Sequence, residues 1–124
     1  MIFMNKVLPP TVLLVEADLE QSLISKSELE AQGYRVIGVE SGEAAFATFA
    51  CEKIDAVVIG AFLPDMHVLD LVDEIVARRN RSVPIIINDA CPNHQHDFRY
   101  WAADAIIDKS SYAQKLFAQV SALL

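Results

Sequence analysis

The chain has 124 residues, 53% of them hydrophobic, and a formal net charge of −7 at pH 7. This length suits one domain with a single core and is short for two. The acidic balance opposes binding to nucleic acid phosphates or to an anionic membrane surface. No stretch has the length of a membrane span, and the apolar N-terminus lacks a signal-type cleavage site, so we expect a cytoplasmic protein.

The two cysteines, Cys51 and Cys91, lie far apart and form no CxxC pattern, as suits a reducing compartment. One metal-binding candidate is the pair His94 and His96, with Asp97 or Cys91 as a further ligand. A structural zinc site needs a closed set of four ligands, and no second ligand cluster is present. We therefore predict that these histidines belong to a polar loop or a helix start and that the chain binds no metal.

The first predicted elements are a strand over Thr11–Glu16, which is a continuous apolar run, and a helix over Leu19–Gln32. Asp18, three residues before Gln21, has the spacing of a helix cap, and Gly33 supplies the left-handed stop. Apolar residues recur in this helix at roughly helical spacing: Leu19, Leu23, Ile24 and Ala31.

Two further strands flank a second helix. Tyr34–Val39 is rich in β-branched and aromatic residues and predicts a strand. Ser41 is the expected cap of an alanine-rich helix that runs to about Glu52. Ile54–Ile59 is the third predicted strand, and it stops at Gly60.

A third helix follows Pro64 and ends in the basic cluster Arg78, Arg79 and Arg81, which suits a helix C-terminus. Its apolar residues have the i, i+3, i+4, i+7 spacing of an amphipathic helix: Val68, Leu69, Leu71, Val72, Ile75 and Val76.

The last elements are strands over Val83–Ile87 and Ala105–Ile107, and a closing helix that starts at Ser110 or Ser111. This helix is expected to turn apolar residues inward: Leu116, Phe117, Val120 and Leu123. Five strands that alternate with five helices require right-handed crossovers. The fold class is therefore α/β, with a parallel sheet and helices on both faces.

Chemistry in such sheets gathers at the carboxyl ends of the strands. The residues at these ends are Glu16, Ala17, Asp18, Gly60, Asn88, Asp89 and Lys109.

The order of these features resembles the receiver domain of two-component response regulators (CheY-like). The segments that carry the resemblance are VLLVEAD, IDAVVIGAFLPDM, VPIIINDA and AADAIIDKS. It implies a flavodoxin-like doubly wound (βα)5 three-layer sandwich with a five-stranded parallel sheet. Residues 1–10 would be an N-terminal extension, and residues 11–124 the receiver-like domain.

Matched to the family motifs, most of the expected active site is replaced. Glu16 keeps the first acidic position, but Ala17 stands at the second and Gly60 at the phosphoacceptor aspartate. Asp89 stands at the hydroxyl position, and Lys109 matches the family lysine. Three further departures are Val68 for a glycine, Ile106 for the aromatic switch residue and Ser110 for a proline.

These replacements predict a pseudo-receiver that is not an enzyme, has no cofactor or metal, and acts by protein–protein interaction. Glycine has no side chain to form an acyl phosphate, and two of three expected carboxylates are absent. Lys109 is expected to pair with Asp89, Glu16 or both, so that replacing Lys109 by Met would perturb stability.

Two alternatives remain open. One is an atypical receiver phosphorylated on Asp65, Asp18 or Asp89, although a loop aspartate such as Asp65 is more often a helix cap. The other is a small-molecule-binding domain that uses the same sheet end without a glycine-rich phosphate loop.

The expected partner is a histidine kinase, an output domain or a second copy of the chain. By resemblance, the surface would be the fourth helix, fifth strand and fifth helix, roughly residues 94–124, which would also support a homodimer. Aromatic residues favour interfaces, and the candidates on this surface are Phe98, Tyr100, Trp101, Ile106 and Tyr112. Neither nucleic acid nor membrane is an expected partner.

Overall fold

A computed structural model describes residues 8–60, 62–78, 83–88, 105–107 and 122–123 of the chain. Up to residue 88, strands and helices alternate as predicted. In chain order the elements are β1 (Thr11–Val15), α1 (Leu19–Ala31), β2 (Arg35–Val39), α2 (Gly42–Cys51), β3 (Ala56–Gly60), α3 (Val68–Arg78), β4 (Ile85–Asn88) and β5 (Ala105–Ile107).

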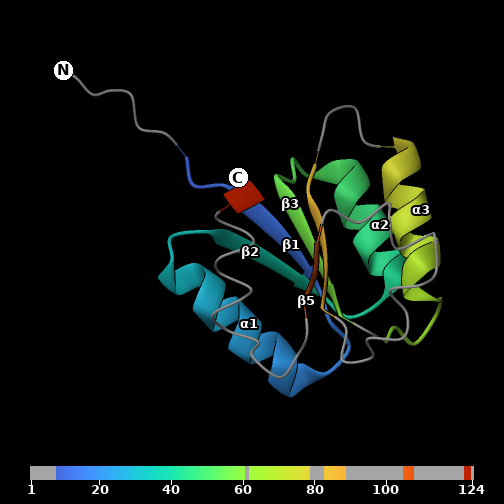
Figure 1. Ribbon diagram of the computed structural model, residues 1–124, viewed down its shortest axis with the longest axis horizontal. Coiled ribbons are helices and arrows are strands. Elements are labelled where there is room, and N and C mark those ends of the chain that lie inside the picture. Colours follow the sequence, from blue (N-terminus) through green and yellow to red (C-terminus); the bar gives the residue numbers. More distant parts are fainter. Residues whose placement is uncertain (1–7, 61, 79–82, 89–104, 108–121, 124) are drawn as a thin grey trace.

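The strands form one parallel sheet in the order β2-β1-β3-β4-β5 (Figure 1). The chain thus steps outward from β1 to β2, returns to the other side of β1 with β3, and continues in that direction. This order is that of the flavodoxin-like doubly wound fold, so the predicted fold class is confirmed. The reversal of direction at β1 and β3 makes the carboxyl ends of these two strands the expected place for a functional site.

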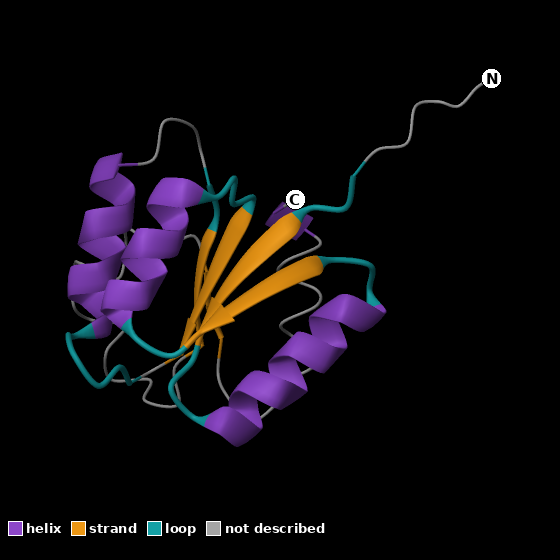
Figure 2. Cartoon of the chain, turned by 180° about the vertical axis from the view of Figure 1, so that it is seen from behind, coloured by secondary structure: helices purple, strands orange, loops and turns teal. Residues whose placement is uncertain are grey.

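Helices cover both faces of the sheet. Helix α1 lies on one side, and α2 and α3 lie together on the other (Figure 2). Alternate residues of each strand serve opposite faces. Thus Leu13 and Val15 of β1 belong to the core cluster under α2 and α3, whereas Val12 and Leu14 join Leu29 of α1 in a second cluster. The two clusters explain why β1 and β3 are buried along their whole length and are almost entirely apolar.

Two helices begin as the sequence predicts. The Asp18 side chain accepts a hydrogen bond from the backbone N–H of Gln21 at 3.0 Å, and Ser41 Oγ accepts one from Ala44 at 3.1 Å. Helix α1 ends before Gly33, whose φ of 93° confirms the left-handed stop.

Helix α3 has the inward face expected of its sequence. Its buried residues all come from the predicted apolar set, with Val76 half-buried: Val68, Leu69, Leu71, Val72 and Ile75. The segment between β4 and β5 lies outside the described residues. Of the predicted closing helix, only residues 122–123 are described, and they are helical.

The expected apolar stripe of α1 does not face the core. Leu19 is 67% exposed, Leu23 is 60% exposed and Ile24 is also exposed, while the buried residues of the helix are Ser25 and Leu29. The last turn fixes this rotation, because the Leu29 carbonyl accepts hydrogen bonds from residues beyond the helix end and its side chain packs into the core. Ser25, four residues earlier, then shares the inward side.

Candidate functional site

The carboxyl edge of the sheet brings Glu16 and Gly60 together. In the register of β1 and β3, Val15 lies opposite Ile59, so the next residue of each strand also lies side by side. The backbone N–H of Glu16 donates to the Val39 carbonyl at 3.0 Å, which extends the sheet pairing by one residue. The backbone of Glu16 is thereby held against the end of β2.

The Glu16 side chain fills the space beside Gly60. A Cβ atom built on Gly60 would lie 2.6 Å from Glu16 Oε1 and 2.8 Å from both Cδ and Oε2. These separations are too short for any side chain at position 60 while Glu16 keeps its conformation. Glu16 is only 4% exposed, so its carboxylate is part of the packed edge and does not extend into solvent.

Glu16 and Asp18 both act on local backbone. Glu16 Oε2 accepts a hydrogen bond from the backbone N–H of Asp18 at 3.1 Å. Asp18 in turn caps α1 through Gln21, and its side chain is exposed. The turn between β1 and α1 is therefore organised by two carboxylates with distinct structural tasks, and Ala17 between them is exposed.

Asp65 caps α2, although it lies in the loop before α3. Its two carboxylate oxygens accept hydrogen bonds from the backbone N–H groups of Gly42 at 2.9 Å and Glu43 at 2.8 Å. With the Ser41 hydroxyl bound to Ala44, the first three N–H groups of α2 all have side-chain acceptors. The Gly42 bond, and then the Glu43 bond, lower the pKa of Asp65 below its ordinary value of 3.8.

The prediction that Asp65 caps a helix is confirmed, but the helix it caps is α2 and not α3, which follows it in the sequence. Helix α3, the next in sequence, is capped by His67, whose Nδ1 accepts a hydrogen bond from the Leu69 N–H at 3.1 Å. The sequence carries no local signal for the Asp65 contact, because the bonded residues lie 22 and 23 positions earlier.

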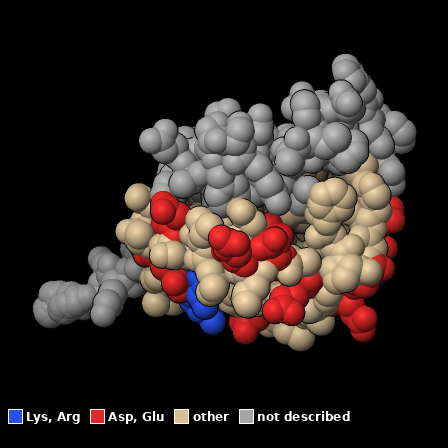
Figure 3. Space-filling model, turned by 90° about the horizontal axis from the view of Figure 1, so that it is seen from below, with Lys and Arg blue, Asp and Glu red and all other residues tan. Residues whose placement is uncertain are grey.

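The surface at this edge is acidic in its described part. Figure 3 looks onto the carboxyl end of the sheet and shows many Asp and Glu side chains with little exposed Lys or Arg. Phe62, just after β3, is 78% exposed on the loop that carries Asp65. This exposed aromatic ring is a feature that periodicity alone did not identify.

Comparison with known proteins gives a consistent result. No protein-family model and no curated protein matches the sequence. Among solved structures, the response regulator TrrA of Thermotoga maritima, in complex with Mg²⁺ and BeF, matches with a TM-score of 0.87 and 28% identity over 93% of this chain and 99% of that chain. A CheY-like receiver domain of Methylobacillus flagellatus matches with a TM-score of 0.86 and 22% identity over 94% and 99% of the two chains.

The likeness to TrrA spans both chains almost completely. The chain has the fold of CheY-like receiver domains, and it is similar over almost its whole length to a response regulator. TrrA has also been crystallised with the histidine kinase ThkA, and in that complex it matches this chain with a TM-score of 0.84 and 28% identity over 93% of this chain and 98% of that chain.

Several predicted site residues lie outside the described residues. Backbone register pairs Ile106 of β5 with Ile87 of β4. Six others have no described position: Asp89, Lys109, Phe98, Tyr100, Trp101 and Tyr112. The predicted Lys109 ion pair and the predicted aromatic interface therefore stay predictions.

The described part of this edge does not fit a magnesium ion. Mg²⁺ requires near-octahedral oxygen ligation, usually from more than one carboxylate together with waters or phosphate oxygens. Here Glu16 folds over Gly60 and bonds to backbone, and Asp18 caps a helix. No group of three His, Cys, Asp or Glu residues suited to a metal occurs among the described residues.

No helix within the described ranges is both long and apolar enough to cross a membrane.

Proposed function

We propose that this receiver domain is a pseudo-receiver, which signals by contact with another protein and carries no phosphoryl group at position 60. The observation that supports this most directly is the contact between Glu16 and Gly60. The position that the family resemblance assigns to the phosphoacceptor has no side chain, and a neighbouring carboxylate fills the space that one would need.

The chemistry of phosphoryl transfer supports the same proposal. An acyl phosphate requires an accessible carboxylate nucleophile, and a divalent cation to neutralise charge on the transferred group. Among the described residues, Glu16 is the carboxylate that lies against Gly60, but it is almost fully buried and accepts a backbone hydrogen bond. A buried, bonded carboxylate is poorly placed to attack a phosphodonor. We propose no catalytic activity for the chain.

The alternative phosphoacceptors are less well supported. Asp18 and Asp65 are exposed, but each already accepts backbone N–H bonds as a helix cap. Phosphorylation of either would remove a carboxylate oxygen from that cap. Asp89 lies outside the described residues, so its candidacy rests on sequence alone. A small-molecule site at the same edge is less well supported, because the Glu16 side chain fills the space beside Gly60.

A protein partner is supported by two kinds of observation. The relative TrrA was crystallised with the histidine kinase ThkA. On this chain, exposed apolar side chains lie at the start of α1, Leu19 and Leu23, and after β3, Phe62. Exposed apolar and aromatic residues of this size are enriched at interfaces. A kinase, an output domain or a second copy remains the proposed partner, in the cytoplasm.

The test is incubation with acetyl phosphate and magnesium, followed by intact mass measurement. A receiver domain that keeps aspartate at the matching position serves as the positive control. The wild-type chain is expected to gain no mass, because Gly60 has no carboxylate and the exposed Asp18 and Asp65 are engaged as helix caps. A phosphate-sized gain that hydroxylamine removes, and that Asp65→Asn, Asp18→Asn or Asp89→Asn abolishes, would overturn the proposal in favour of an atypical receiver.

A further inference from the structure

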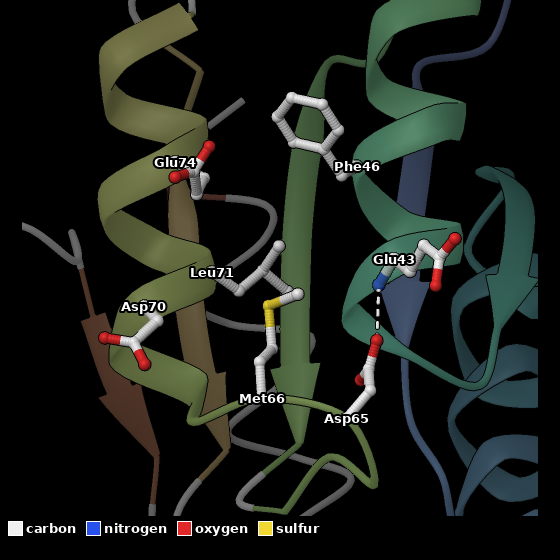
Figure 4. A pocket seen from close by; sticks show the side chains of 7 residues that line it. All are labelled: Glu43, Phe46, Asp65, Met66, Asp70, Leu71 and Glu74. Atoms are coloured by element: carbon white, nitrogen blue, oxygen red, sulfur yellow. Dashed lines mark hydrogen bonds between the residues drawn. The ribbon is translucent and has the colours of Figure 1, made fainter.

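A groove of about 440 Å³ lies between α2 and α3, away from the contact of Glu16 with Gly60. Its lining combines an apolar base with acidic side chains (Figure 4). The seven residues that line it are Glu43, Phe46, Asp65, Met66, Asp70, Leu71 and Glu74.

The apolar base comes from three elements that the fold brings together. Phe46 projects from α2 and Leu71 from α3, while Met66 comes from the loop that precedes α3 (Figure 4). The position of Met66 is fixed by a close approach to Gly42, where a Cβ atom would collide with the Met66 side chain. Leu71 is buried, whereas Phe46 and Met66 are half-buried, so part of their apolar surface borders the groove.

The rim is strongly acidic. Four of the seven lining residues are Asp or Glu, and all four are exposed. Asp65 is committed to the cap of α2, but its negative charge still contributes to the potential of the groove. Carboxylates around a concave apolar surface attract a cation and disfavour an anion, so a nucleic acid does not suit this groove.

The chain itself shows which cation this surface accepts. The guanidinium carbon of Arg78 lies 4.3 Å from the centre of the Phe46 ring. The Nη1 atom of Arg78 also lies 2.6 Å from Glu74 Oε2, in a hydrogen-bonded ion pair. Two lining residues, one aromatic and one acidic, thus already bind a guanidinium group together. The contacts of Arg78 are a second observation, separate from the acidic composition of the rim, that favours a cation in this groove.

We propose that the groove between α2 and α3 binds a basic segment of a partner protein through an arginine side chain. Arginine fits this combination because its planar guanidinium stacks on aromatic rings and pairs with carboxylates. Its aliphatic stem lies against apolar surface while the charged end contacts the rim. This interaction is separate from the proposed role of position 60 and holds whether or not the chain is phosphorylated.

The probe is a synthetic hexapeptide, acetylated and amidated, of sequence Leu-Arg-Leu-Arg-Leu-Arg. It is titrated into the ¹⁵N-labelled full chain, and amide chemical shifts are followed. We expect the largest shifts in residues 42–47 and 65–75, and an affinity that falls as salt is added. Shifts confined to other surfaces, or no shifts at millimolar peptide, would overturn the proposal.

Matched variants separate this groove from general charge attraction. Glu43→Gln with Asp70→Asn removes two rim charges, and Glu20→Gln with Glu30→Gln removes two exposed charges from α1. The rim pair is expected to weaken binding about threefold to tenfold more than the α1 pair. Equal weakening by both pairs would mean that only net charge matters, and would contradict the proposal.

Two further variants test the role of the guanidinium contact. Phe46→Leu keeps an apolar side chain but removes the ring, and should weaken binding about tenfold. Arg78→Gln removes the internal competitor for Phe46 and Glu74, and should strengthen binding relative to the Lys26→Gln control. Weaker binding by Arg78→Gln, or equal binding of spermidine and the peptide, would show that the groove does not recognise arginine in a peptide.

Discussion

The carboxylate of Glu16 occupies the space into which any side chain at position 60 would project. Glu16 directly follows β1 and Gly60 is the last residue of the paired strand β3, so their closeness is a consequence of register. An ideal Cβ atom at Gly60 would lie 2.6 Å from Glu16 Oε1, well inside van der Waals contact. The identities of these two positions are therefore physically linked, since a larger residue at one requires a rearrangement of the other.

The first prediction concerns Gly60→Ala. The added methyl group must displace a buried carboxylate, and overpacking of this kind costs about 1–3 kcal/mol of unfolding free energy. Gly38→Ala is the matched control, because Gly38 lies in β2 and its Cβ would meet nothing closer than Ser22 Oγ at 3.9 Å. Urea unfolding should show a lower midpoint for Gly60→Ala than for Gly38→Ala.

A double-mutant cycle identifies the cause of that loss. In a Glu16→Ala background the obstructing carboxylate is gone, so the additional cost of Gly60→Ala should fall by about 1 kcal/mol or more. An unchanged cost would mean that the penalty arises elsewhere, and the proposed link between positions 16 and 60 would be wrong.

The second prediction concerns Ser25, which is fully buried on α1. Its hydroxyl oxygen has no hydrogen-bond partner in the described structure. A buried, unsatisfied hydroxyl costs about 1–3 kcal/mol, and alanine removes it without changing the shape of the site much. Ser25→Ala should therefore stabilise the chain by about 1 kcal/mol more than Ser27→Ala, an exposed control with the same helix-propensity gain of about 0.5 kcal/mol. Equal urea midpoints would contradict this.

The sequence predicts the sheet more accurately than it predicts the orientation of α1. Strands such as β1 and β3 are buried on both faces, so continuous apolar runs identify them without any knowledge of their neighbours. In α1, apolar residues occur on more than one side of the helix. The choice between sides depends on Leu29, whose packing and carbonyl contacts involve the following turn and the sheet. Tertiary contacts therefore determine which side of α1 faces the sheet.

The third prediction follows from this orientation. Leu19→Gln and Leu23→Gln change exposed side chains and should each alter the free energy of unfolding by about 0.5 kcal/mol or less. Leu29→Ala should cost about 2–5 kcal/mol, because it leaves a cavity between α1 and the sheet. A large loss for Leu23→Gln would show that this face of the helix is covered in the folded chain.

The position of the candidate site is predictable from topology, but its contacts are not. Parallel sheets direct functional residues to strand ends, and this rule selects Glu16 and Gly60 as candidates, which the structure places side by side. How Glu16 folds over Gly60, and which helix Asp65 caps, depends on distances between segments remote in sequence. No local pattern records such distances. The family resemblance indicates that Gly60 stands at the phosphoacceptor position. Only the structure shows that the Glu16 carboxylate fills the space beside it.

The fourth prediction tests the cap of α2 by Asp65. Its pKa in the folded state lies below the ordinary value of 3.8, because Gly42 and then Glu43 donate hydrogen bonds to the carboxylate. The charged form thus stabilises the fold. This contribution is complete above pH 3.8 and is lost as the pH falls through the folded-state pKa. Asp65→Asn should lower the urea midpoint at pH 7, and the difference from wild type should shrink under acid.

Asp73→Asn, at an exposed position on α3, is the matched control for this cap. It removes the same charge without removing a bond to α2, so its urea midpoint should stay near that of wild type from neutral to acidic pH. The comparison depends on a contact that joins the loop after β3 to the start of α2. If Asp65→Asn and Asp73→Asn behaved alike at every pH, the carboxylate of Asp65 would contribute only its charge, and the two backbone bonds would not stabilise the fold.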